Sequence, residues 1–137
     1  MCSRPSILGS QRGTAAIEFA LVLPMLAMLL LGIVGYGDRI FTAQALQQAA
    51  NDGARAAIGG LDRAERGTLA IAATRTSLTR TGMLDASLAT VAIDDDDATF
   101  LVRLSYDASA RPLMTAGLVP MPGRTIVRTA AIRLESP

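Results

Sequence analysis

The side chains that most often carry out catalysis are nearly absent from this chain. It contains no histidine, and its one cysteine is Cys2, close to the start. Histidine-dependent triads, histidine metal sites and thiol chemistry in the body of the protein are therefore excluded. Catalysis by paired carboxylates stays open in principle, but no pattern in the sequence places two carboxylates in one cleft. We therefore expect no enzymatic activity and no cofactor.

One run of acidic residues could bind a metal ion. Asp94, Asp95, Asp96 and Asp97 are consecutive, and carboxylate oxygens are ligands that Ca²⁺ accepts. Their spacing does not follow an EF-hand loop, and the central glycine of such a loop is missing. We interpret residues 94–97 as the solvated turn of a β-hairpin, and we expect no metal site.

A single carboxylate, Glu18, lies beside a long apolar run that has the length of a membrane-spanning helix. Glu18 is followed by an uncharged run from Phe19 to Gly37. A helix of that length spans about 28 Å, close to the ~30 Å of a hydrocarbon core, so residues 14–37 are predicted to form a transmembrane helix. A charge at the bilayer centre costs up to about 3 kcal/mol. Glu18 must therefore lie at headgroup depth or have a functional partner.

The residues around Glu18 follow a known pattern. Gly13 is followed by four small or apolar residues and then by Glu18 and Phe19, as in a type IV prepilin cleavage site. Pro24, a leucine block and the run Ala-Leu-Gln-x-Ala-Ala-x-x-Gly-Ala-Arg complete the pattern. In this order of features, residues 12–55 resemble the N-terminal signature of the TadE-like family, the minor pseudopilins of the tight-adherence (Tad, or Flp) pilus.

The resemblance implies a role for each residue at the head of the helix. The prepilin peptidase would cut after Gly13, which has no side chain, and Thr14 would become the mature N-terminus. Glu18 would be the fifth mature residue, and its carboxylate could pair with the free amine of a neighbouring subunit and set axial register. Phe19 stands where major Flp pilins commonly have tyrosine. Together with the length of the chain, this favours a pseudopilin over the main structural subunit.

The charge pattern predicts the orientation in the membrane. Arg4, Arg12 and the initiating amine precede the apolar run, whereas Asp38 and Arg39 flank its far end. By the positive-inside tendency, residues 1–13 form a cytoplasmic leader and the rest of the chain faces the periplasm. The net charge of +1 is too small for a nucleic-acid-binding protein.

The remaining residues, 38–137, predict a periplasmic α+β domain of pilin-like type. The membrane helix is expected to continue as an amphipathic helix over about 38–58 and to end at Gly59 and Gly60. Small and apolar residues form the stripe that should face the domain: Phe41, Leu46, Ala49, Ala50, Gly53, Ala54 and Ala57.

A second helix and a small antiparallel sheet should complete the domain. Asp62, with Glu65 three residues later, is a typical helix N-cap, so the second helix is expected over about 62–78. Strands are expected over about 88–93, 99–106 and 124–134, with a long loop over 107–123. In the middle strand, alternation predicts one shared face for Phe100, Val102, Leu104 and Tyr106.

The resemblance also implies partners and a location. The partners are the prepilin peptidase, the major Flp pilin, a sibling pseudopilin, the inner-membrane assembly platform with its ATPase, and membrane lipid. The location is the bacterial inner membrane, which the chain crosses once, or the extracellular pilus if the chain enters the fibre. No nucleic acid or small-molecule substrate is expected. Arg55 could contact an assembly partner or act as a solvated cap of its own helix. An alternative is a secreted or membrane-anchored adhesin or structural protein unrelated to pili, since Ala43-Gln44-Ala45 offers a signal-peptidase site.

Overall fold

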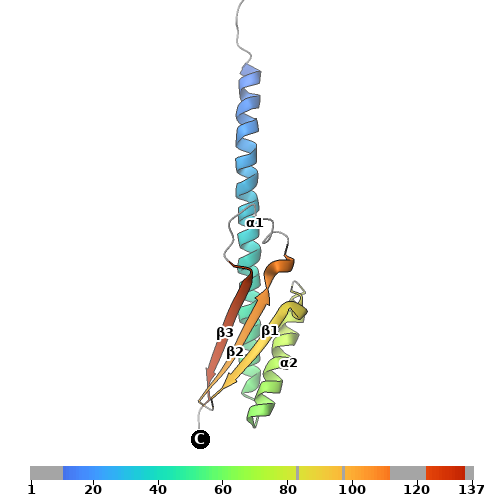
Figure 1. Ribbon diagram of the computed structural model, residues 1–137, viewed down its shortest axis with the longest axis vertical. Helices are drawn as coiled ribbons and strands as arrows, with labels where there is room; N and C mark the ends of the chain where they lie inside the picture. Colours follow the sequence, from blue (N-terminus) through green and yellow to red (C-terminus); the bar gives the residue numbers. More distant parts are fainter. Residues whose placement is uncertain (1–10, 83, 97, 112–122, 135–137) are drawn as a thin grey trace, which may run out of the picture.

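A computed structural model describes residues 11–82, 84–96, 98–111 and 123–134 (Figure 1). The predicted leader residues Cys2 and Arg4, Asp97 and most of the predicted loop lie outside the described residues. The α+β fold class is confirmed: a long helix, a second helix and a three-stranded antiparallel sheet of order β1-β2-β3. The elements are α1 (Gln11–Ala57), α2 (Arg63–Thr81), η1 (Ala86–Leu88), β1 (Ala89–Asp95), β2 (Thr99–Asp107), η2 (Ala108–Ala110) and β3 (Thr125–Arg133).

Helix α1 is continuous over 47 residues and passes through Pro24 without interruption. Its N-terminal half stands clear of every other described element, whereas its C-terminal half lies against α2 and the sheet (Figure 1). The predicted membrane segment and the predicted amphipathic segment are therefore one helix.

The turn from α1 into α2 is fixed by capping. The carboxylate of Asp62 accepts a hydrogen bond from the backbone N–H of Glu65 at 2.8 Å. The Glu65 carboxylate accepts from the N–H of Leu61, also at 2.8 Å, one residue before its usual partner in a capping box. At the other end Gly82 adopts φ 63°, which suits glycine, and its N–H donates to the carbonyl of Thr79. With this C-cap, α2 runs to Thr81, three residues past the expected end.

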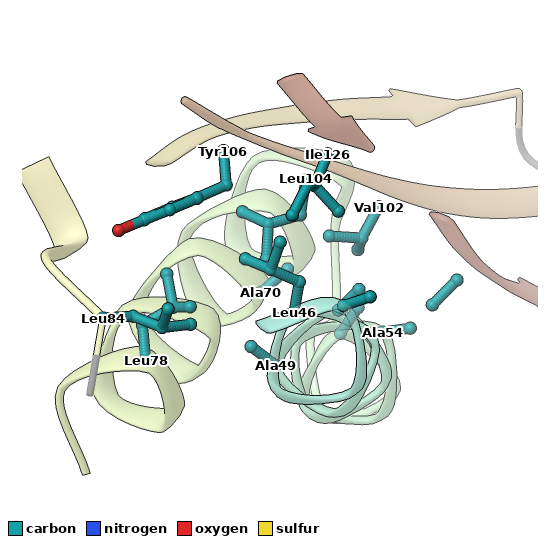
Figure 2. Packing of buried hydrophobic residues seen from close by; sticks show 14 of the residues in the cluster. Leu46, Ala49, Ala54, Ala70, Leu78, Leu84, Val102, Leu104, Tyr106 and Ile126 are labelled. Carbon is teal, nitrogen blue, oxygen red and sulfur yellow. The ribbon is translucent and has the colours of Figure 1, made fainter. Parts of the chain in front are cut away.

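The core lies between the sheet and the two helices (Figure 2). The alternation along β2 places Phe100, Val102, Leu104 and Tyr106 on the inner face, where each is at most 2% exposed. Leu46 of α1 and Leu78 of α2 close the core from the helical side. Each apolar side chain of this size contributes about 1.5–3 kcal/mol when fully buried.

Small residues allow α1 and α2 to approach closely. A Cβ atom on Gly53 would lie 2.1 Å from Oγ1 of Thr74 and 3.0 Å from the carbonyl oxygen of Ala70. The Thr74 hydroxyl is itself buried and donates to that carbonyl at 2.7 Å. Beside this contact, Ser77 donates to Asp52 at 2.7 Å. Glycine is therefore required at position 53 by packing.

The predicted inward stripe of α1 is wrong at Phe41. This side chain is 73% exposed, while Thr42 and Ala43 beside it are 2% and 9% exposed. The other members of the stripe are buried. The domain approaches α1 from the side of Thr42, Leu46 and Ala49, and Phe41 lies beyond the edge of that side. Because most residues of the stripe are alanines, the sequence pattern does not show where the buried side of the helix ends, and this explains the error.

The acidic run is also not one solvated turn. Asp94 and Asp95 belong to β1, and Asp95, opposite Phe100 on the inner face, forms an ion pair of 3.0 Å with Arg66 of α2. The side chain of Asp95 is only 5% exposed. Asp96 begins the turn and accepts from the N–H groups of Ala98 and Thr99. The strand continues two residues past the predicted end because Arg66 compensates the buried charge.

Candidate functional site

The candidate site is the part of α1 that the rest of the described chain leaves bare. From residue 17 to residue 41, the large apolar side chains are 39–74% exposed. Monomeric soluble proteins rarely expose so large an apolar surface. The residues are Ile17, Phe19, Leu21, Val22, Leu23, Met25, Leu26, Met28, Leu29, Leu30, Leu31, Ile33, Val34, Tyr36, Ile40 and Phe41.

This segment has the length and composition of a membrane span. Among the described residues, one helix passes that test, and its most apolar window has a mean hydropathy of 2.5 and is 0% buried. A core helix of a soluble protein would be mostly buried, so burial does not account for this composition. The segment is compatible with a single-pass membrane anchor.

The predicted processing residues lie at the start of this helix. Because α1 begins at Gln11, the bond between Gly13 and Thr14 lies in its first turn. Glu18 and Phe19 are exposed on the following turns. Glu18 comes four residues after Thr14, so both residues lie on the same side of the helix. Within the described residues Glu18 forms no ion pair, so its charge must be compensated by water, lipid headgroups or another molecule.

Two charged residues join the bare segment to the folded domain. Asp38, the first charge after the apolar run, forms an ion pair with Arg111, which follows η2. Arg39 donates to the carbonyl oxygen of Gly123 at 2.8 Å. The hydroxyl of Thr42 donates to the carbonyl of Asp38 at 2.8 Å. These contacts attach the domain to α1 directly where the helix would leave the membrane.

The sequence suggested only part of this junction. It marked Asp38 and Arg39 as the flank of the membrane segment, but their partners lie more than 70 residues later in the chain. No local pattern connects such distant positions. Arg55 is exposed in the last turn of α1, where a positive charge is favourable for the helix dipole.

The carboxylates of the domain with perturbed pKa values cap the two short helices η1 and η2. The Ser87 hydroxyl and N–H both donate to Asp85, at 2.6 and 2.9 Å, and lower the pKa of this carboxyl group. At the start of η2, the N–H of Ser109 donates to Asp107 and lowers its pKa in the same way. In the described part of the chain, no cluster of three or more histidine, cysteine or acidic side chains could hold a metal ion.

Comparison with known proteins gives one match. The family model for TadE-like proteins matches residues 13–55, about a third of the chain. No curated protein and no solved structure matches this chain. The match begins at Gly13, at the predicted cleavage site, and ends two residues before the end of α1, so it contains the whole bare segment, including Asp38 and Arg39, but not their partners Arg111 and Gly123. The resemblance read from the sequence is thereby confirmed: residues 13–55, which form nearly all of α1, match the TadE-like protein family.

Proposed function

We propose that this chain is a minor pseudopilin that acts in the assembly of a Tad/Flp pilus used for surface adherence, by initiating, capping or regulating the fibre. The observation that carries the proposal is a single helix with two different halves. Its N-terminal half is apolar and bare, its C-terminal half is the core helix of a small domain, and the TadE-like match covers both. Such a helix can hold a periplasmic domain at a fixed height while its other half packs among helices in the membrane.

In this proposal the mechanism is association, and no bond is made or broken by the chain itself. The chain would be inserted once in the inner membrane, with its N-terminus in the cytoplasm. The prepilin peptidase would release residues 1–13. The amine of Thr14 and the carboxylate of Glu18 would then be the two charges at the head of the mature helix. Pairing with these charges on neighbouring subunits would offset the cost of placing them among apolar side chains.

The position of the proposed cleavage bond is compatible with processing. Proteases bind extended substrates, and the Gly13–Thr14 bond lies in the first turn of α1. The first backbone N–H groups of a helix have no partner inside the helix, so this turn opens at little cost. The major pilin, a sibling pseudopilin and the inner-membrane platform with its ATPase are the proposed partners in later assembly.

The geometry disfavours the secretion alternative. Signal peptidase acting after Ala45 would remove Asp38, Thr42 and Ala43, although Thr42 and Ala43 are buried in the domain and Asp38 pairs with Arg111. The cut would also fall in the middle of a continuous helix that packs on the core. An adhesin released in this way would lose part of its own domain.

The deciding experiment is the N-terminal sequence and intact mass of the membrane-bound protein, with and without the cognate prepilin peptidase. A start at Thr14 that requires the peptidase supports the proposal. A start at Met1 despite active peptidase leaves a plain membrane anchor, and a start at Leu46 indicates ordinary secretion. Gly13→Val should block maturation, whereas the matched leader variant Gly9→Val should not.

A second variant separates processing from assembly. Glu18→Gln keeps the shape of the side chain but removes its charge, so we expect normal cleavage and a strong loss of assembled pili. Counting pili by electron microscopy, alongside the mass of the mature protein, distinguishes the two steps. Normal piliation by this variant would contradict the proposed pairing of Glu18.

A further inference from the structure

One face of the domain half of α1 is not covered by the rest of the described chain. Leu46, Ala49 and Ala54 point from α1 into the core (Figure 2). On the opposite side lie five exposed residues separated by alternating steps of three and four positions, the spacing that keeps side chains on one face of a helix. These residues, here called the amide face, are Phe41, Gln44, Gln48, Asn51 and Arg55.

The amide face has unused hydrogen-bonding capacity. Within the residues that the structure describes, the amides of Gln44 and Gln48 bond to no other residue. Asn51 accepts one bond, at 3.3 Å, from Gln47, which also donates to the carbonyl of Thr129 in β3. Each amide offers both donors and acceptors.

The residues of the amide face line two hollows. On the side of α2, a hollow of about 480 Å³ is lined by four residues of this face, Phe41, Gln44, Gln48 and Asn51, and extends to Thr81 and to Leu84, which follows α2. On the other side, a hollow of about 230 Å³ lies between Gln44 and Arg128 of β3. Because the ridge of one helix packs into a groove of its partner, these hollows can receive side chains of a second helix.

The same face continues toward the membrane. Repeating the spacing of three and four positions backwards from Phe41 leads to Gly37, Val34 and Leu30, which belong to the bare segment. Because α1 is one unbroken helix (Figure 1), a partner that packs along the amide face can follow it into the bilayer. Gly37 has nothing within 4 Å of the position of a Cβ atom, so it leaves room for close approach.

We propose that the amide face is the contact surface for a second copy of this chain, packed parallel and related by a two-fold axis. The membrane segment gives every copy the same direction and the same height, so identical residues meet across such a pair. Amides suit this arrangement because an amide can both donate to and accept from an identical amide. At the distal end, Arg55 lies one turn from the half-buried Asp52, whose carboxylate also accepts a hydrogen bond from Ser77, and a two-fold pair can bring the Arg55 guanidinium of one copy toward the Asp52 carboxylate of the other.

The exposed ring of Phe41 also has a place in such a pair. It lies on the rim of the 480 Å³ hollow, which contains Leu84 as an apolar wall. In a two-fold arrangement, the ring of each copy can enter the hollow of the other, and this removes both rings from water. The proposal requires that α1 spans a membrane, but it does not require processing by a peptidase or incorporation into a fibre.

Disulfide crosslinking in membranes tests the proposal. In a Cys2→Ser background, single cysteines are introduced as Gln48→Cys and Asn51→Cys, with Thr76→Cys as the matched control. Thr76 is exposed on α2 and neighbours Ser77, which bonds to Asp52, so the control lies at a similar height on another side of the molecule. The full chain is expressed in a bacterial host without Tad components, and dimer formation under mild oxidation is followed over time.

We expect dimers at positions 48 and 51 to form about tenfold or more faster than at position 76, because paired thiols react within one complex and the control reacts only by collision. Equal rates at all three positions would overturn the proposal. The same assay is repeated in a host that contains the other Tad proteins, and crosslinks that appear only there, and that join this chain to one of them, would overturn the proposal in favour of a different partner. The N-terminal sequence of the mature protein, measured separately, tests the proposed function and is independent of either result.

Discussion

The two halves of α1 have the same secondary structure but different surroundings. In the half before Thr42, large apolar side chains are exposed on all sides and no described element covers them. In the half from Thr42 to Ala57, one side is buried against α2 and the sheet, and the other carries amides and charges. The apolar side chains of the first half must be covered by something outside the described chain, whereas those of the second half are covered by the core of the domain.

This difference means that a residue's effect depends on which half of the helix it occupies. The folded domain is stabilised by its core and by the contacts of Asp38 and Arg39, so substitutions in the second half and at these two positions should change its free energy of unfolding. Other substitutions in the first half should act on membrane insertion or association. Matched pairs of substitutions within α1 test this distinction.

The largest contrast is expected between two leucines of α1. Leu46 is completely buried, whereas Leu30 is 54% exposed. Leu46→Ala should lower the free energy of unfolding of the domain by about 2–5 kcal/mol because it leaves a cavity in the core. Leu30→Ala should leave this free energy unchanged.

The measurement is urea unfolding of the full chain in detergent, followed by tyrosine fluorescence. In a Tyr36→Phe background, the only tyrosine is Tyr106, which is 2% exposed and therefore reports on the core. If both leucine variants destabilised the domain equally, the bare half of α1 would be part of the folding unit and the comparison would fail.

The next contrast uses two glycines. Gly53→Ala places a methyl group against Oγ1 of Thr74 and should cost about 1–3 kcal/mol of domain stability. Gly37→Ala meets nothing within 4 Å and should leave domain unfolding unchanged. Adding Thr74→Ala to Gly53→Ala removes the clashing hydroxyl, so the double variant should lose less than the sum of the single losses in the same urea assay. Simple additivity would argue against this contact as the cause.

A smaller effect is expected at the junction of the halves. The ion pair of Asp38 and Arg111 is partly exposed, with side-chain exposures of 27% and 20%. Asp38→Asn should therefore cost no more than about 1 kcal/mol, and the loss should shrink at high salt because the pair is screened. Asp52→Asn, which alters a bond to the neutral Ser77, is the control, and its effect should not depend on salt. A loss at Asp38 that persists in high salt would assign the effect to packing.

The smallest effect concerns pH and only the domain half. The pKa of Asp85 is lowered in the folded state, chiefly by the hydroxyl of Ser87. The resulting stability is present above the ordinary aspartate pKa of about 3.9 and is lost as the pH falls below it through the folded value. Ser87→Ala should reduce this part of the acid dependence, since it removes the largest cause. Identical acid titrations of stability for the variant and the parent chain would contradict the assignment.

Much of the fold follows from the sequence because its signals are local. The apolar run from Phe19 to Gly37, the N-cap at Asp62 and the alternation of Phe100, Val102, Leu104 and Tyr106 each depend on neighbouring residues alone. The α+β class and the order of its elements could therefore be predicted. The likeness to TadE-like proteins was also readable, because it depends on a continuous motif in α1.

One long apolar segment with Glu18 at its head, followed by a small α+β domain, could be read from the amino-acid sequence alone. The side of α1 that faces the domain could not, and tertiary packing leaves Phe41 exposed and buries Thr42. Tertiary packing also pairs Asp95 with Arg66 and Asp38 with Arg111. The physical reason is that these contacts join elements far apart in the chain, and the packing of α2 and the sheet on α1 brings them together.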